Sequence, residues 1–438
     1  MIKFFKKIRQ KMMSESKLSK YLLYAIGEIV LVVIGILIAL SINKINKKIL
    51  LLLLIIFNLG TSFGQVNILW TFETEGRIYS TPKVDNKILY FGSGDQHIYA
   101  IEHETGKLLW KYKTEGKVHS SPETNDKNVF FASTDGNVYC LDKKTGTLIW
   151  KFESEGEKQY GLWDYYLSSP KIENNILYWG SGDSNIYAIN STSGKVIWKY
   201  KTQDIVHADP VIYEEGVYIG SFDGNLYKLN KYNGALTWKF NTIGAYYFPK
   251  GEIQKGVTIH NGLIYFGSRD YNLYVVDAKN GTGVWNYRQP RGWVISTPLI
   301  YKDYVYFGSS DGHMFYCFGI NSAQKKWEVP TNMRIFSQAA AYNDEILFST
   351  FDGKIISVNY NTGQTNWEFQ TEGSQKNYSK IYKPDGTFLD EFELYGKNYL
   401  ESEKMIHNLG SILSDPIIHE GKLFFGSSDG NLYAIKLK

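Results

Sequence analysis

The stretch VHSSPETNDKNVFFASTDGNVYCLDKKTGTLIWKFE, residues 118–153, contains one unit of a repeat that decides the fold. It holds four runs of strand-forming residues, because β-branched and aromatic side chains gather between short polar breaks. The breaks at Asp135-Gly136 and Thr145-Gly146 have the composition of tight hairpin turns. The stretch therefore predicts four antiparallel strands that follow one another along the chain.

The same unit recurs from residue 66 to the end of the chain. A tryptophan in the fourth strand returns at spacings of 40, 40, 48, 40, 47, 42 and 40 residues. These tryptophans are Trp70, Trp110, Trp150, Trp198, Trp238, Trp285, Trp327 and Trp367. An aspartate between the second and third strands returns as often, at Asp95, Asp135, Asp183, Asp223, Asp270, Asp311, Asp352 and Asp429. Two markers that each occur eight times predict eight four-stranded units, the pattern of a β-propeller.

The two ends of the repeat region predict a closed ring rather than an open solenoid. A lone tryptophan-containing strand, VNILWTFE at 66–73, precedes the first unit, and the chain ends after a third strand, NLYAIKLK at 431–438. The spare first strand therefore fits the missing fourth strand of the last unit, and pairing them removes both exposed sheet edges. We predict an all-β, eight-bladed propeller of four-stranded blades, closed by its N- and C-terminal strands.

Composition and charge exclude several classes of protein. Cys140 and Cys317 are the two cysteines among 438 residues, too few for a disulfide-stapled scaffold or a multi-cysteine metal site. The net charge of +4 comes from residues 1–64, which hold ten Lys/Arg against two Asp/Glu. The other 374 residues hold 38 against 42, a net charge of −4. A mildly acidic body is not typical of a nucleic-acid-binding protein, so we expect no nucleic-acid partner.

The N-terminal residues predict a membrane-spanning helix. Seven basic residues within 1–20 precede the apolar run 21–42, which is long enough to cross a bilayer. Residues 1–43 also resemble a short N-terminal membrane module of bacterial envelope proteins. We therefore expect residues 1–48 to form a basic N-terminus and a transmembrane helix that brings the chain to the membrane.

A second apolar segment has the form of a secretory signal peptide. Three lysines precede ILLLLLIIF at 49–57, and small residues follow before Gln65. We therefore expect a signal-peptide-like segment at 49–64 and the propeller at 65–438. This arrangement predicts a cell-envelope protein, exported or membrane-anchored, with its propeller outside the cytoplasm.

A small residue, a turn glycine and a tryptophan recur in a fixed order within the units. The clearest copies are Ala100-x-x-x-x-Thr105-Gly106-x-x-x-Trp110 and Ala188-x-Asn190-x-x-x-Gly194-x-x-x-Trp198. This pattern resembles the tryptophan-docking motif of the PQQ-like β-propeller repeat family, and the resemblance extends over residues 66–438. In that family the small residue leaves room for the indole between blades. The resemblance therefore implies that the eight repeat tryptophans are structural docking residues.

The resemblance implies one of two functions. One branch of the family contains quinone-dependent alcohol and sugar dehydrogenases, which hold PQQ with a divalent cation such as Ca²⁺ and often have an adjacent Cys-Cys pair. The other branch, BamB-like, is non-catalytic. This chain has no Cys-Cys pair, and Cys140 and Cys317 fall in opposite blades. No zinc-ligand spacing, nucleophile triad or phosphate loop is present in the sequence.

We therefore expect a non-catalytic, BamB-like envelope scaffold that binds proteins, with no catalytic residues, no cofactor and no metal. Two alternatives stay open. One is a PQQ-dependent dehydrogenase, in which PQQ and Ca²⁺ would bind. The other is a carbohydrate- or polymer-binding propeller, for which exposed aromatic side chains would serve.

Three long insertions predict the binding face. Residues 154–167, 241–254 and about 372–411 all follow a fourth strand, so they share one face with the aspartate-containing turns. The insertions are rich in aromatic residues, and aligning the units adds a ring of basic residues at the channel mouth. The candidate binding residues are Trp163, Tyr166, Tyr247, Trp293, Arg77, Lys117 and Arg334. We expect envelope proteins or polymers to bind this face through aromatic and arginine anchors.

Two further local features carry expectations. Pro384-Asp385-Gly386 predicts a small hairpin within residues 380–400. His119 and His207 fall in equivalent positions of different units, so we expect them to pack within their blades rather than bind a metal together.

Overall fold

The computed structural model describes residues 67–158, 161 and 163–438. The predicted transmembrane helix at 21–42 and the signal-like segment at 49–64 lie outside the described residues. Within the described part of the chain, no helix has both the length and the hydropathy that a membrane span requires.

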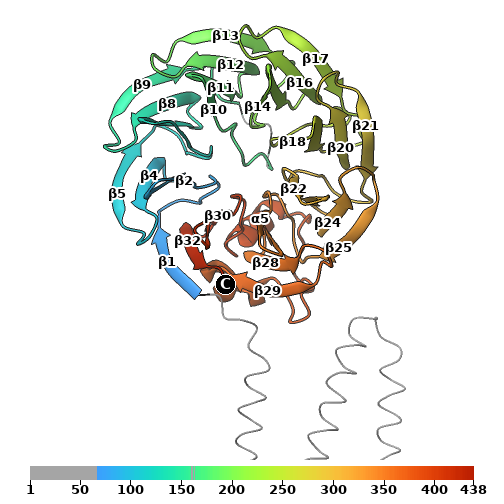
Figure 1. The fold of residues 1–438 in the computed structure, drawn as a ribbon. Helices are drawn as coiled ribbons and strands as arrows, with labels where there is room; N and C mark the ends of the chain where they lie inside the picture. Colours follow the sequence, from blue (N-terminus) through green and yellow to red (C-terminus); the bar gives the residue numbers. More distant parts are fainter. Residues whose placement is uncertain (1–66, 159–160, 162) are drawn as a thin grey trace, which may run out of the picture. The chain divides into compact units, whose positions relative to one another are not determined.

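Eight four-stranded antiparallel sheets occupy residues 67–438 as far as the structure describes them, and they form the blades of a β-propeller (Figure 1). The first four blades are β2 (Lys83–Asp85), β3 (Ile88–Gly92), β4 (His97–Glu102) and β5 (Leu108–Lys113); β6 (Glu123–Thr124), β7 (Asn128–Ala132), β8 (Asn137–Asp142) and β9 (Leu148–Glu153); β10 (Lys171–Glu173), β11 (Ile176–Gly180), β12 (Asn185–Asn190) and β13 (Val196–Lys201); and β14 (Val211–Tyr213), β15 (Gly216–Gly220), β16 (Asn225–Asn230) and β17 (Leu236–Asn241). The next three are β18 (Thr258–His260), β19 (Leu263–Gly267), β20 (Asn272–Asp277) and β21 (Gly283–Arg288); β22 (Leu299–Tyr301), β23 (Tyr304–Gly308), β24 (Met314–Gly319) and β25 (Lys325–Pro330); and β26 (Ala340–Tyr342), β27 (Glu345–Ser349), β28 (Lys354–Asn359) and β29 (Thr365–Gln370). The all-β, eight-bladed fold predicted from the repeat is confirmed.

The eighth blade is built from both ends of the repeat region. It consists of β30 (Ile417–His419), β31 (Lys422–Gly426), β32 (Asn431–Lys436) and β1 (Asn67–Glu73). Strand β1 pairs antiparallel with β32 over its whole length, and the two lie side by side in Figure 1. The predicted closure of the ring is therefore confirmed.

The innermost strands are shorter than the sequence predicts. In the second blade VHSSPET suggested a full strand, but β6 contains only Glu123 and Thr124. Pro122 has no N–H for a ladder bond, and the Oγ of Ser120 accepts from the N–H of Ala132 at 2.7 Å in place of a backbone partner. Equivalent serines do the same in other blades, at Ser80, Ser168, Ser296 and Ser414.

The tryptophans on the outer strands join each blade to the next. The ring of Trp110 covers Gly146 so closely that a Cβ on that glycine would lie 2.7 Å from the ring. The indole Nε1 of Trp110 donates to the carbonyl of Lys143 at 3.2 Å. The equivalent bond is made by Trp70, Trp150, Trp198 and Trp327.

Three repeat tryptophans depart from this pattern. Trp238 covers Gly281, but its Nε1 has no hydrogen-bond partner among the described residues. The Nε1 of Trp285 likewise lacks one there, and the facing turn at 320–324 lacks the Thr-Gly pair. Trp367 instead donates to the carboxylate of Glu345 in its own blade.

Residues 371–411 form a small helical cap, which the sequence did not predict. It contains α4 (Glu372–Asn377), the 3-10 helix η1 (Tyr378–Lys380) and α5 (Tyr399–His407). The hairpin expected around Pro384-Asp385-Gly386 is reduced to a single bridge between Tyr382 and Phe388.

The cap closes one end of the central channel. Ile406 and Leu409 of the cap belong to one buried cluster with Tyr79 of the first blade and Phe351 of the seventh. Helix α5 lies inside the ring in Figure 1. The longest insertion therefore packs over the channel instead of projecting from it.

Deleting residues 67–73 should convert the closed ring into one with an exposed edge. The deletion leaves β32 without its outer partner and removes Trp70 from Gly106, so we expect a lower melting temperature and soluble aggregates on gel filtration. Thr71→Ala, an exposed substitution on the same strand, is the control and should change neither. A monomer with unchanged melting temperature after the deletion would contradict closure by this strand.

Candidate binding face

The three insertions meet around a pocket on one face of the ring. The pocket has a volume of about 220 Å³. Its lining residues are Trp163, Phe248, Tyr271, Arg291, Gly292, Trp293, Ser310, Asp311, Arg334, Phe336 and Tyr395. Trp163, Phe248 and Tyr395 come from the first, second and third insertions. Trp293 comes from the connection that follows the fifth blade.

Aromatic rings in edge-to-face contact form the wall of this pocket. The ring centroid of Trp293 lies 6.0 Å from that of Trp163 and 4.9 Å from that of Phe248, with interplanar angles of 72° and 88°. Tyr395 lies 6.4 Å from Trp163. The guanidinium of Arg269 lies 4.5 Å from the centroid of Trp293, a cation–π distance. The predicted residues Trp163 and Trp293 thus meet in one wall, with Trp293 buried and Trp163 half-buried.

Arg334 is buried at the base of the pocket and has partners within the chain. Its side chain is 2% exposed, and its Nη1 lies 2.8 Å from the carboxylate of Glu403 in α5. Its Nε lies 3.2 Å from Asp311, and its Nη2 donates to the hydroxyl of Tyr395 at 2.8 Å. Tyr165 also donates to Glu403, at 2.5 Å. Arg334 therefore holds the cap in place and does not present a free charge on the surface.

The other predicted members of the basic ring are dispersed. Arg77 is half-buried and donates to the hydroxyl of Tyr79 at 3.3 Å, whereas Lys117 is exposed. Tyr166 is buried, and its hydroxyl donates to the carbonyl of Leu413 at 3.2 Å. The structure brings Arg334, Trp163 and Trp293 together at the pocket and places Tyr166 in the wall of the channel.

The second insertion ends in an exposed apolar tip. Ile243, Tyr246 and Tyr247 are 70%, 91% and 75% exposed, and the rings of the two tyrosines are 4.9 Å apart. Tyr247 was a predicted binding residue, and its neighbours extend the same surface. Phe248, the next residue, turns inward and lines the pocket. The tip therefore lies beside the aromatic pocket.

His207 forms ion pairs that the sequence did not predict. His119 does pack as expected, 4.8 Å from the ring of Tyr79, and burial lowers its pKa to about 3. His207 instead lies 2.6 Å from Glu157 and 2.9 Å from Asp164, both in the first insertion. Burial alone would lower the pKa of His207, but the two carboxylates raise it to about 10. A buried imidazolium therefore anchors the first insertion.

Comparison with known proteins supports this architecture. The family described as outer membrane protein assembly factor BamB matches residues 65–170, 137–248 and 242–391. BamB from Moraxella catarrhalis is 16% identical, with a TM-score of 0.64, and the match covers 85% of this chain and 100% of that one. None of the curated proteins compared with the chain matches its sequence.

Two other solved structures share the fold with similar coverage. The computationally designed protein Ika8 is 15% identical with a TM-score of 0.62, covering 83% of this chain and 98% of that one. A europium-containing methanol dehydrogenase is 11% identical with a TM-score of 0.62, covering 86% and 94%. At such identities the likeness shows the propeller fold alone.

Replacing His207 with glutamine should destabilise the protein by roughly 3–5 kcal/mol at neutral pH, because it removes the positive charge that lies between two buried carboxylates. The pKa of His207 is about 10 in the folded protein against an ordinary 6.5. Its stabilising contribution is therefore fully present below pH 6.5 and is lost as the pH rises through about 10.

The measurement is the difference in unfolding free energy between wild type and His207→Gln, taken by denaturant titration across this pH range. The difference should shrink as the pH rises. His260→Gln, on the opposite face, is the control and should give no such trend. A difference that does not change with pH would show that His207 is uncharged in the folded protein.

Proposed function

This chain belongs to the family described as outer membrane protein assembly factor BamB, and we propose that it is a non-catalytic scaffold of the cell envelope that binds other proteins. The family description names an assembly factor, which is a protein-binding role. The proposal places the binding surface on the face that carries the three insertions. This proposal rests mainly on the exposed tip at Ile243, Tyr246 and Tyr247.

The tip has the composition of a protein-binding anchor. Two tyrosines and an isoleucine that are at least 70% exposed leave apolar surface in water beside a pocket walled by Trp163 and Trp293. Aromatic side chains at the centre of a contact typically contribute most of its binding energy. The cap and the first insertion are held by buried ion pairs, so the pocket is preformed while the tip is free to contact a partner.

A quinone cofactor does not fit the central channel as the described residues pack it. The space beside Tyr166 and Asp209 is about 10 Å³, close to the ~10–15 Å³ that a single water molecule requires and far too small for a fused-ring quinone. The outer pocket has one carboxylate among its lining residues, Asp311, and this accepts from Arg334 and Tyr395. That donor set does not suit Ca²⁺, which prefers several free oxygen ligands. Both observations favour the scaffold over the dehydrogenase.

A photo-reactive amino acid placed at Tyr247 should form covalent adducts with an envelope protein in cells. The same residue placed at Tyr232, which is 52% exposed on the opposite face, is the matched control and should form none with that protein. The partner, once purified, should bind the variant Tyr246→Ala/Tyr247→Ala more weakly by about 2 kcal/mol or more.

Thermal melts of the double variant should match wild type, since both tyrosines are exposed. Adducts that form equally at both positions, or full affinity in the double variant, would remove this face as the protein-binding surface. Adducts to glycan alone would favour the polymer-binding alternative.

An envelope scaffold requires the propeller to lie outside the cytoplasm, as the N-terminal segments predict. A recognition sequence for a specific protease inserted between Tyr246 and Tyr247 should be cut when the protease is added to intact spheroplasts. A cytoplasmic marker protein with the same insertion should stay whole. Protection of the propeller until the cells are lysed would place it in the cytoplasm and contradict the proposal.

A further inference from the structure

One position of the repeat contacts the preceding blade, and the type of residue at this position differs from blade to blade. The residue that follows each third strand lies next to the end of the first strand of the blade before it. In the second blade this residue is Lys143, whose Nζ lies 2.6 Å from Asp85 of the first blade. In the fourth blade it is Lys231, whose Nζ lies 2.7 Å from Glu173 of the third. This position therefore joins neighbouring blades on the face opposite the insertions.

A third seam uses a different attraction at the same place. In the seventh blade the position holds Tyr360, and the Nζ of Lys302 from the sixth blade lies 3.6 Å from its ring centroid. The backbone of these seams is equivalent, while the side chains that bridge them are not. The contact that bridges the last blade and the first therefore depends on the side chains at that seam, not on the repeat.

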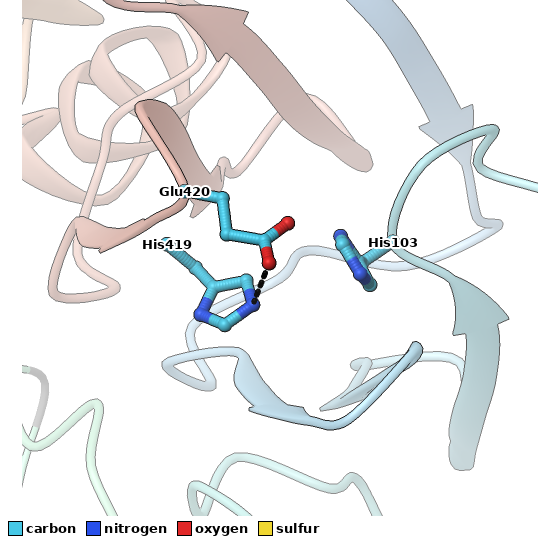
Figure 2. A group of neighbouring side chains, drawn as sticks. All are labelled: His103, His419 and Glu420. Atoms are coloured by element: carbon cyan, nitrogen blue, oxygen red, sulfur yellow. Dashed lines mark ion pairs between the residues drawn. The ribbon is translucent and has the colours of Figure 1, made fainter.

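At the closing seam the ion pair between Lys422 and Glu104 bridges the blades, and two histidines and a glutamate lie beside it. His103 follows the third strand of the first blade, His419 ends the first strand of the eighth, and Glu420 follows it in the turn (Figure 2). The rings of His103 and His419 are 5.3 Å apart at an angle of 87°, and the Nε2 of His419 lies 3.9 Å from the carboxylate of Glu420. One ligand atom from each residue lies within 4.8 Å of the other two. Figure 2 shows the Glu420 carboxylate directed into the space beside both rings.

His103 is prepared to act as a ligand. The residue is 4% exposed, and its Nδ1 has no hydrogen-bond partner within the described residues. The carboxylate of Glu104 lies 3.8 Å from this nitrogen, beyond hydrogen-bond reach. A buried polar nitrogen without a hydrogen bond costs free energy that a bound ion would recover. Burial lowers the pKa of His103, and the charge of Glu104 opposes this shift.

We propose that His103, His419 and Glu420 bind a divalent transition-metal ion, Zn²⁺ in the first instance, that joins the last blade to the first. Two imidazoles and one carboxylate form a donor set typical of zinc, whereas Ca²⁺ and Mg²⁺ prefer oxygen ligands throughout. Three protein ligands leave a fourth tetrahedral position for water.

The site needs a small movement to close on an ion. Each ligand atom of a zinc site lies about 2.0–2.2 Å from the ion, so the ligand atoms themselves lie closer to one another than 4.8 Å. The three ligand atoms here lie within 4.8 Å of one another and must therefore approach further. The side chains of His419 and Glu420 are 39% and 62% exposed. Both residues lie where strand β30 turns into β31, so their side chains can move toward the buried His103. The nearby cation Lys422 is already paired with Glu104, at 2.5 Å.

The location gives the ion a structural effect. The main chain of His103 accepts from the indole of Trp70 at 3.2 Å, and Trp70 lies on the strand that closes the ring. The closing seam holds together parts of the chain more than 300 residues apart in sequence. An ion bound there would stabilise the folded state by an amount that grows with the logarithm of the ion concentration above its Kd.

The test uses the full-length protein without a polyhistidine tag, freed of metal by chelation and titrated with Zn²⁺. Calorimetry should show one Zn²⁺ site in the wild-type protein. In the variants His419→Gln and Glu420→Gln the affinity of this site should fall about tenfold or more. The melting temperature of wild type should rise with Zn²⁺ concentration, and that of each variant should not. Both variants alter exposed side chains, so their melting temperatures without metal should equal that of wild type.

His260→Gln is the matched control. His260 ends the first strand of the fifth blade, the same repeat position as His419, but the facing residue in the sixth blade is Ile320. This variant should bind Zn²⁺ as wild type does, and His103→Gln should lose the site. The proposal is overturned if wild type shows no Zn²⁺-dependent melting shift, or if the shift survives in His419→Gln. Equal loss in His260→Gln would overturn it as well, and the histidine pair would then be an ordinary edge-to-face packing contact.

Discussion

The contact between each outer-strand tryptophan and the next blade is the constraint on which the ring depends. At six of the eight seams the indole lies over a glycine such as Gly146, whose φ of 72° and missing side chain supply both the turn and the space. One large ring with a donor at its edge therefore fixes how far apart two blades lie and how they are rotated. Repeating that contact around the chain brings the ends together, and pairing of β1 with β32 completes the circle.

A ring held in this way tolerates long insertions, because each blade contacts its neighbours alone. The insertions use this freedom differently. The third folds over the channel and is held by Arg334 through Glu403, while the first is held by His207 through Glu157 and Asp164. Buried ion pairs of this kind contribute little net stability but demand a particular geometry. They give the loops a defined position, and the aromatic pocket is the space that this position leaves.

The two faces of the ring have different chemistry for the same reason. On one face the insertions have covered the channel and left the tip at Ile243, Tyr246 and Tyr247 in water. On the other face short turns meet at each seam, and a single repeat position carries residues as different as Lys143, Tyr360, His103 and Ile320.

The sequence by itself determined the number of blades, the closure of the ring and the residues that dock blade to blade. These features repeat every 40 to 48 residues, so each copy supports the interpretation of the others. It also indicated which face carries the insertions, because the position of an insertion between strands assigns it to one side. Trp163 and Trp293 stood out because the repeat does not account for them.

The tertiary structure decided what each unrepeated side chain does. Arg334 looked like an exposed anchor in the sequence, yet its partner Glu403 lies 69 residues away in a helix that no period predicts. His207 looked like a packing residue, yet its partners come from an insertion. His103 did not stand out in the sequence, and the histidine that faces it comes from the opposite end of the repeat region. A charge or a ligand atom is defined by what faces it across space. In segments without periodicity, the sequence does not say which residues those are.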